Sequence, residues 1–240
     1  MTAAAQAMLD ARGIDTFYGP SHILRGVNFH VGRGETVSLL GRNGMGKTTL
    51  LRTLMGLLKP KSGAILLDGR DVTDARANIK ARAGMGFVPE GRGIFPNLSV
   101  EENLLFAARP GPDGRVDWTQ EAIYQMFPRL FERRRIWGNQ LSGGEQQMLT
   151  IGRVLLSNPS ILLIDEATEG LAPKMRDAIW ETLGIIARKG ISIVIVDKNL
   201  DDLVDLVDRH VVLTKGQVVF EGTSAELLAD QEMVRTMLGV

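Results

Sequence analysis

The chain of 240 residues contains no cysteine and only three histidines. Without cysteine it cannot form disulfides, use a thiolate nucleophile or bind zinc through sulfur, and three histidines argue against a histidine-rich metal site. Charge of one sign is also lacking, because 28 Lys and Arg residues balance 28 Asp and Glu residues. The sequence therefore offers no global basic field for nucleic acid or anionic lipid, and an anionic ligand must be held locally.

Long apolar runs are missing as well. The most continuous ones are ILLI at Ile161–Ile164 and ISIVIV at Ile191–Val196, far short of the ~20 residues of a membrane helix. The first residues, MTAAAQAMLDARG, lack the basic and apolar regions of a secretory signal. A hydrophobic fraction of 44% is enough for a sizeable core. Since no internal repeat or linker divides the sequence, we expect one soluble cytoplasmic domain over residues 1–240.

Apolar patterning predicts an α/β fold. From Lys47 the leucines recur at helical spacing until Lys59 and Pro60 end the run. The middle, 89–158, is expected to be mostly helical, and RPGPDGR at Arg109–Arg115 is expected to be an exposed loop between helical segments. The later part alternates short apolar strands with helices, which is typical of a parallel sheet. The expected strands are 22–31, 35–40, 64–67, 84–88, 161–164 and 191–196.

A glycine-rich turn follows the strand that ends at Leu40. Its sequence, GRNGMGKTT, matches G-x-x-x-x-G-K-[ST] and opens a helix. In such a loop the backbone N–H groups surround phosphates, Lys47 reaches the β- and γ-phosphates, and Thr48 ligates Mg²⁺. The predicted nucleotide-binding residues here are Gly41, Arg42, Asn43, Gly44, Met45, Gly46, Lys47, Thr48 and Thr49.

Two carboxylates, Asp165 and Glu166, follow the apolar run 161–164. In P-loop nucleotide hydrolases a carboxylate at this place holds Mg²⁺, which suits Asp165. Glu166 is then placed to orient or deprotonate the attacking water. Taken alone the pair is weak evidence, since acidic residues after a strand often only cap the next helix.

The third motif is LSGGEQQ at Leu141–Gln147. The spacing of Ser142 and Glu145 is that of a capping box, so the motif starts a helix. A glycine-rich helix start with free N–H groups is also an anion site, able to bind the γ-phosphate of a nucleotide held by another subunit. The residues concerned are Ser142, Gly143, Gly144 and Glu145.

In this order and spacing, GRNGMGKTT, LSGGEQQ and ILLIDE resemble the three diagnostic motifs of ATP-binding cassette (ABC) transporter ATPase subunits over nearly the whole chain. The resemblance implies ATP hydrolysis with Mg²⁺. It also implies a P-loop fold with a mainly parallel core sheet, an antiparallel β subdomain and a helical subdomain at about 89–158. Two such subunits meet head to tail, each site pairing one phosphate loop with the other subunit's LSGG helix.

The resemblance assigns four further positions. Tyr18 matches the aromatic residue that stacks on adenine, plain packing being the alternative. Glu90 stands where the family usually has a glutamine that lines the γ-phosphate and Mg²⁺, and a carboxylate cannot donate as an amide does. Lys198 replaces the usual histidine, as a catalytic residue or as one half of a surface ion pair with Asp197. Ala172 replaces a frequent aspartate.

Three segments resemble LivF-type ATPases of branched-chain amino acid importers: VPEGRGIFPNLSVEENL, LSGGEQQM and DEATEGLAP, with the ending MVRTMLGV similar too. This implies work at the inner face of the plasma membrane with two permease subunits, a second copy or a paralogous ATPase and, indirectly, a periplasmic binding protein, but no nucleic acid. The alternatives are a soluble non-transport ABC-type ATPase, for which 240 residues leave little room, and a regulatory subunit with a weakly hydrolysing site.

We hypothesise a heterodimer with unequal sites. The site of Lys47, Glu166 and Lys198 would hydrolyse weakly, and the opposite site, which uses Ser142 and Gly144, would carry most turnover. Two other segments remain open. Arg133–Arg135 are interpreted as a solvated helix face. Apolar residues after Glu90 lie either in the core or in a groove for the membrane subunit; they are Phe95, Pro96 and Leu98.

Overall fold

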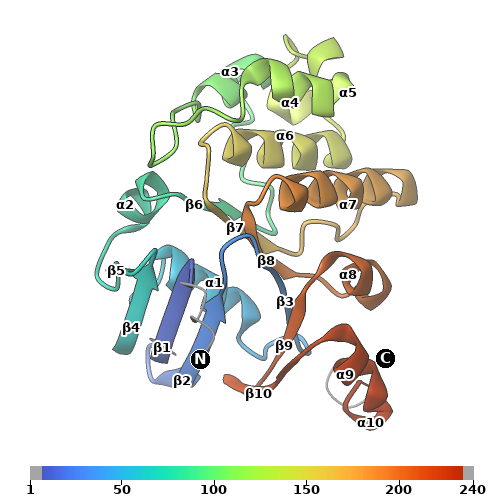
Figure 1. Cartoon of the computed structure of the whole chain (residues 1–240). Coiled ribbons are helices and arrows are strands. Elements are labelled where there is room, and N and C mark those ends of the chain that lie inside the picture. Colours follow the sequence, from blue (N-terminus) through green and yellow to red (C-terminus); the bar gives the residue numbers. More distant parts are fainter. Residues whose placement is uncertain (1–6, 235–240) are drawn as a thin grey trace.

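A six-stranded sheet organises the chain, which the computed structural model describes over residues 7–234 (Figure 1). Its strand order is β10-β9-β3-β8-β7-β6, and all neighbours are parallel except β10 and β9. The mainly parallel sheet expected from the alternation of strands and helices is therefore confirmed. The strands are β3 Thr36–Leu40, β6 Met85–Val88, β7 Ile161–Asp165, β8 Ser192–Val196, β9 Arg209–Thr214 and β10 Gln217–Gly222.

A second, antiparallel sheet has the order β2-β1-β4-β5. It confirms the antiparallel β subdomain. Its strands are β1 Leu9–Tyr18, β2 Ser21–Val31, β4 Ser62–Leu67 and β5 Arg70–Asp71. Tyr18 is the last residue of β1, a strand that the sequence patterning did not predict.

Helices pack against both faces of the parallel sheet. Along the chain they are α1 Lys47–Met55, α2 Ala77–Arg82, α3 Val100–Leu105, α4 Gln120–Met126, α5 Pro128–Glu132, α6 Gly143–Leu155, α7 Pro173–Arg188, α8 Leu200–Leu206, α9 Ser224–Ala229 and α10 Gln231–Met233, with a 3₁₀ turn at Gly138–Gln140. Helices α3 to α5 gather beyond α6 at the top of Figure 1. The expected helical middle is present, interrupted by the expected loop at Arg109–Arg115. Within residues 7–234 no helix combines the length and apolar character needed to span a bilayer.

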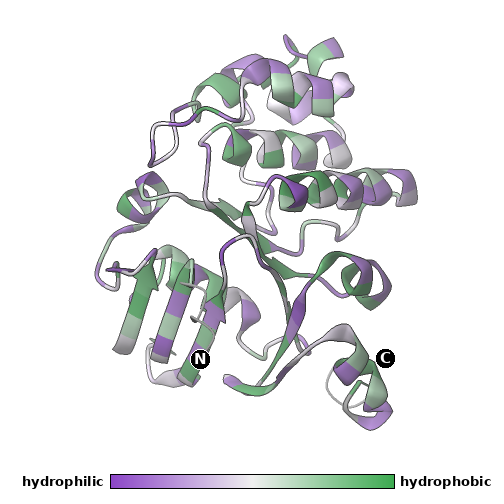
Figure 2. Ribbon diagram, viewed as in Figure 1, coloured by the Kyte–Doolittle hydropathy of each residue, from purple (hydrophilic) through white to green (hydrophobic). Residues whose placement is uncertain are grey.

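The central strands β3, β7 and β8 are buried along their whole length and mostly apolar, because both faces of the parallel sheet are covered (Figure 2). In β7, Leu162 and Ile164 face the core formed with α6 and α7, whereas Ile161 and Leu163 face the core formed with α1 and the antiparallel sheet. This alternation fixes which side of the sheet each residue at the end of the strand faces.

Some expected boundaries differ from the structure. Helix α1 ends at Met55 because Gly56, at φ 79°, adopts the left-handed conformation that closes a helix. Strands β1, β5, β9 and β10 were not predicted. The arginines at 133–135 follow α5 instead of forming a helix face, because α5 ends at Glu132. From residue 235 on, the ending MVRTMLGV lies outside the described residues.

Candidate functional site

The glycine-rich turn connects β3 to α1 and requires its glycines. Gly41, Gly44 and Gly46 have φ values of 139°, 78° and 106°, which L side chains rarely adopt. A Cβ at Gly41 would lie 2.2 Å from the carbonyl oxygen of Leu213 in β9. The loop is therefore folded tightly over the sheet edge, with α1 starting at Lys47.

Lys47 is buried, and its ammonium is held by the loop itself. Its Nζ donates to the carbonyl oxygens of Gly41 and Arg42 at 2.8 and 3.2 Å. Burial lowers the pKa of Lys47, while the nearby carboxylate of Glu166 opposes that shift. An ammonium with only carbonyl partners at the mouth of a glycine loop is well suited to bind a phosphate.

Thr48 and Asp165 meet at the start of α1. The Thr48 hydroxyl donates to Asp165 Oδ1 at 3.1 Å. Burial raises the pKa of Asp165, and the Thr48 hydroxyl opposes that shift. A hydroxyl and a buried carboxylate are the oxygen ligands that Mg²⁺ takes, and the pair fits that ion. The alternative, that the acidic pair only caps the next helix, does not hold, since α7 begins at Pro173 with Ala172 as its N-cap.

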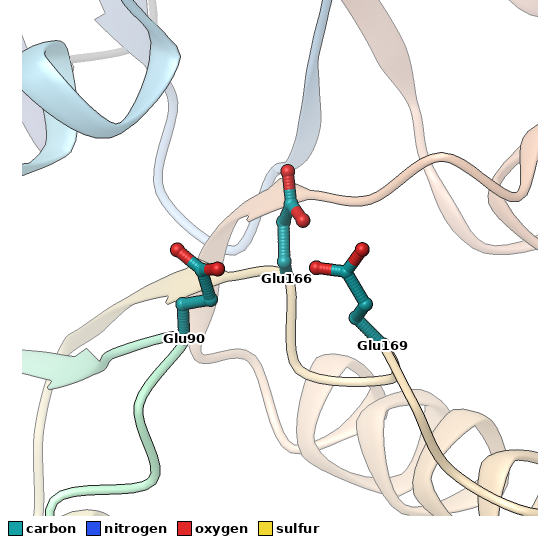
Figure 3. A group of neighbouring side chains, drawn as sticks. All are labelled: Glu90, Glu166 and Glu169. Atoms are coloured by element: carbon teal, nitrogen blue, oxygen red, sulfur yellow. The ribbon is translucent and has the colours of Figure 1, made fainter. Parts of the chain in front are cut away.

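Three glutamates gather beside this pair (Figure 3). Glu90 follows β6, Glu166 follows β7, and Glu169 lies in the loop after β7; one carboxylate oxygen of each lies within 4.8 Å of the others. Glu166 has a φ of 47°, a conformation that non-glycine residues seldom adopt. Burial and the neighbouring Glu169 raise the pKa of Glu166 to about 7. A carboxylate with a pKa in this range is suited to act as a general base.

Lys198, which follows β8, lies against these carboxylates. Its Nζ is 2.7 Å from Glu169 Oε1 and 3.3 Å from Glu166 Oε2. The alternative of an ion pair with Asp197 was wrong, because the Asp197 carboxylate accepts from the backbone N–H of Lys198 and from the Thr168 hydroxyl. Sequence reasoning missed Glu169, although it stands only three residues after Glu166.

A cavity of about 460 Å³ joins these groups, and its lining comes from the phosphate loop, β2 and the ends of β6, β7 and β8. The residues are Ile23, Asn43, Gly44, Gly46, Lys47, Thr48, Thr49, Glu90, Glu166, Glu169 and Lys198. The structure thus brings the phosphate loop together with Glu90, Glu166 and Lys198. Gly41, Arg42, Met45 and Asp165 adjoin this lining through the contacts of the loop and of β7.

Tyr18 and the LSGG residues do not line this cavity. Tyr18 is 43% exposed at the end of β1. Ser142 caps α6: its hydroxyl accepts from Glu145 N–H, and its own N–H donates to Glu145 at 2.8 Å. Gly143 and Gly144 are packed so closely that a Cβ would come within 2.8 Å of Arg92 and 2.5 Å of Met175. Within one copy of the chain, α6 therefore starts away from the phosphate loop's cavity.

The apolar residues after Glu90 lie near a separate groove of about 490 Å³, lined among others by Leu57, Phe87 and Phe106. Phe95 is 36% exposed and meets the ring of Phe106 edge-on at 5.0 Å. Pro96 is exposed and Leu98 is half-buried. Burial in the core, one of the two alternatives for this segment, therefore does not apply to Phe95 and Pro96.

This chain has relatives among known proteins. Residues 24–169 match the model of the ABC transporter family, a range that includes the phosphate loop, the LSGG segment and the carboxylates. The high-affinity branched-chain amino acid transport ATP-binding protein BraG of Pseudomonas aeruginosa is 38% identical over 97% of this chain and 100% of BraG. A probable branched-chain amino acid transport ATP-binding protein LivF of Archaeoglobus fulgidus is 30% identical over 97% and 99%.

Solved structures agree with the fold. A nucleotide-free ATP-binding cassette from an ABC transporter superposes with a TM-score of 0.82 at 25% identity, covering 98% of this chain and 99% of that one. Another such cassette, in its ADP conformation, gives a TM-score of 0.79 at 25% identity, with 95% and 97% covered. The similarity therefore extends beyond the three motifs to nearly the whole chain.

Proposed function

The chain belongs to the ABC transporter family and is an ATPase of that family, and on this premise we propose that it energises uptake of branched-chain or related amino acids through separate membrane subunits. The cargo follows from the names of BraG and LivF, which share their full length with this chain. One observation carries the ATPase chemistry, namely the single cavity that joins Lys47, Thr48 and Glu166. In this proposal the chain works at the inner face of the plasma membrane.

The phosphate loop binds the triphosphate of ATP. Its backbone N–H groups and the N-terminus of α1 face the phosphates, and Lys47 exchanges its carbonyl partners for phosphate oxygens. Thr48 and Asp165 would hold Mg²⁺, with Glu90 lining the same cavity. When bound, the ion would supply positive charge that neutralises charge developing on the phosphates.

Glu166 orients the attacking water and accepts its proton. The carboxylate stands at the end of β7, next to the Mg²⁺ ligand Asp165 and on the wall of the same cavity. The Asp165 carboxylate lies against Thr48 of α1, whereas the Glu166 carboxylate lies against Lys198 after β8. The two adjacent carboxylates thus have separate tasks.

The LSGG helix serves a nucleotide held by another subunit. Ser142 is exposed at the start of this 13-residue helix. The Ser142 cap uses the N–H of Glu145, so the N–H groups of Gly143 and Gly144 are the ones proposed to meet the anion. The partner is a paralogous ATPase or a second copy of this chain. Tyr18, exposed at the end of β1, is the proposed adenine contact.

The groove beside Phe95 and Phe106 is the proposed seat of a permease segment. Its apolar floor is bordered by arginines, and Arg153 stacks on the Phe95 ring at 4.4 Å. Phe106 is 72% exposed, which is costly for a large aromatic side chain unless a partner covers it. Two permease subunits would each contact one ATPase of the dimer.

The heterodimer with unequal sites remains part of the proposal. The ammonium of Lys198 has no acceptor lone pair and cannot shuttle a proton while charged, so hydrolysis at this chain's own site would be weak. A Lys198→His chain, assayed in the assembled transporter, should hydrolyse ATP faster than the parent. An unchanged rate would remove the argument for unequal sites at this residue.

The decisive experiment measures ATP hydrolysis by the purified chain, alone and with its paralogous ATPase and permease subunits in lipid. Lys47→Ala and Glu166→Gln should abolish turnover at this chain's site, whereas Glu132→Gln, at an exposed ion pair on α5, should not. Turnover that requires the assembly and rises with loaded binding protein supports the importer. Robust turnover unaffected by membrane partners would favour a soluble ATPase instead. A Glu166→Gln chain that trapped no more ATP than the parent would favour a regulatory subunit.

A further inference from the structure

Glu169 and Lys198 form an ion pair at the mouth of the nucleotide cavity. The two residues come from different loops, one after β7 and one after β8, and their charged atoms are 2.7 Å apart. About half of each side chain is exposed. The same ammonium lies 3.3 Å from Glu166, whose side chain is only 13% exposed.

Carboxylates outnumber ammonium groups in the lining of the cavity. Three carboxylates, Glu90, Glu166 and Glu169, lie within reach of one another, and Lys198 is the ammonium that contacts two of them. The second cation of the cavity, Lys47, is turned toward the backbone carbonyls of the loop. Lys198 therefore supplies the positive charge that these carboxylates need, and Glu169 holds it more closely than Glu166 does.

An ammonium group has three donors on a flexible four-carbon stem. Two donors suffice for the two carboxylates, so the group can also reach toward a phosphate that enters the same cavity. A phosphate at the γ position would compete with Glu169 for Lys198. ADP has no such phosphate and would leave the ion pair undisturbed.

We propose that Glu169 is a positioning residue that lowers the preference for ATP over ADP: its carboxylate competes with the γ-phosphate for the ammonium of Lys198. This inference rests on the proposed function, because it requires that nucleotide binds in this cavity with its phosphates on the loop of Lys47. Glu169 makes ATP binding weaker than it would otherwise be and leaves ADP binding unchanged. It therefore narrows the difference in affinity between ATP and ADP.

The test is a comparison of dissociation constants for the Mg²⁺ complexes of ADP and of a non-hydrolysable ATP analogue, measured on the full chain. Four proteins form a cycle: the parent, Glu169→Gln, Lys198→Met and the double variant. Glu169→Gln should tighten the ATP analogue about threefold, the effect expected for releasing a half-exposed ion pair, and leave ADP unchanged. In the Lys198→Met background the same change should alter neither constant.

Two results would overturn the proposal. Equal tightening of ADP and of the ATP analogue would mean that Glu169 acts without regard to the γ-phosphate. A gain of the same size in the Lys198→Met background would mean that Glu169 repels the phosphates by its own charge and not through Lys198. Glu132→Gln, which removes a carboxylate from an exposed pair with Arg129, is the matched control and should change neither constant.

The experiment also separates this proposal from the function on which it rests. If Lys47→Ala binds both nucleotides as well as the parent, the phosphate loop is not the binding site and the proposed function fails. If Lys47→Ala loses binding while Glu169→Gln changes nothing, only the role of Glu169 fails. Since Glu169 and Gln have nearly the same shape and the site is half exposed, folding should be unaffected, which thermal unfolding of each variant will verify.

Discussion

The backbone N–H of Gly216 donates to the carbonyl oxygen of Met45 at 3.0 Å. Gly216 lies in the turn between β9 and β10, and Met45 lies in the phosphate loop. The carbonyl oxygen of Gly216 in turn accepts from Arg25 N–H in β2 at 2.9 Å. A single glycine therefore ties the phosphate loop to both sheets.

Alanine at Gly216 should damage this junction. A Cβ there would lie 1.8 Å from the carbonyl oxygen of Ile23, and the φ of 77° is unfavourable for any L side chain. We expect Gly216→Ala to lower the free energy of unfolding by at least about 3 kcal/mol, since backbone must move in addition to the left-handed strain. It should also weaken MgATP binding, because Met45 loses its support. Urea unfolding and nucleotide titration measure the two effects.

The control for this change is Gly114→Ala. Gly114 has a similar φ of 80°, but nothing lies within 4 Å of a Cβ placed on it. Gly114→Ala should lower the free energy of unfolding only by the left-handed backbone strain, about 1 kcal/mol, and should leave nucleotide binding intact. An equal loss of unfolding free energy at the two positions would show that the close approach to the Ile23 carbonyl oxygen is unimportant.

Hydrolysis should depend on pH through Glu166. Its pKa is raised to about 7, so the carboxylate is protonated below that pH and cannot accept a proton from water. We expect kcat/KM at this chain's own site, measured in an assembly whose opposite site is inactive, to rise as the pH increases through about 7. Lys198→Met should move the midpoint upward, because the ammonium lowers the pKa of Glu166, and Glu169→Gln should move it downward. A flat profile between pH 6 and 8 would contradict the role of Glu166 as base.

Features encoded by consecutive residues were predicted from the sequence, whereas contacts between distant segments were not. The phosphate loop was predicted in full because nine consecutive residues define it, and Glu166 followed from its place after an apolar strand. The ion pair of Lys198 and Glu169 was missed because it depends on β7 and β8 being neighbours, which periodicity within one segment does not reveal. The sequence suggested the adjacent Asp197 as an alternative partner of Lys198, but consecutive residues at the end of a strand point in different directions.

The missed strands have equally specific causes. In β1, Gly13 and charged residues interrupt the alternation of polar and apolar residues, and irregular pairing around Ile14 lets the strand form nonetheless. In β10 no residue is fully buried, so its apolar positions give a weak signal. Pairing specifies both strands, because β1 lies between β2 and β4 and β10 pairs with β9 across a short turn, and these contacts outweighed the local pattern.

Lys80 should make stability depend on pH at the alkaline side. This lysine of α2 is fully buried, donates to the Leu54 carbonyl oxygen at 2.9 Å, and has its pKa lowered by burial from 10.5 to about 8. Between these two values the unfolded chain binds more protons than the native one, so the free energy of unfolding rises with pH. Relative to Lys80→Met, we expect the parent to gain at most about 3 kcal/mol between pH 8 and 10.5.

Urea unfolding of both proteins at pH 7.5 and at pH 10 checks this expectation. The methionine variant serves as the reference because it retains every other titrating group, including Asp71 and Asp74 beside Lys80. The loss of the hydrogen bond to Leu54 shifts the variant equally at both pH values and cancels from the comparison. A difference between the two proteins that stays constant with pH would rule out the shift at Lys80.

Ser142 should show both a structural and a functional effect. Ser142→Ala removes the cap of α6 and should lower the free energy of unfolding by about 1 kcal/mol. It should also reduce ATP hydrolysis by the assembled complex while leaving MgATP binding to the isolated chain unchanged, since α6 serves the partner's nucleotide. Thr223→Ala removes an equivalent capping box from α9 and is the matched control. If Thr223→Ala lowered hydrolysis equally, the effect would come from stability alone.

The strand order has a consequence for biosynthesis. Strand β3, which carries the phosphate loop, pairs with β8 and β9, and neither neighbour exists until the last quarter of the chain has been made. At ribosomal rates of about 5–20 residues per second, the loop waits roughly ten seconds or more for the strands that fix it. During that interval the apolar strand is uncovered and the nucleotide cavity is incomplete. Nucleotide can therefore assist only the last steps of folding.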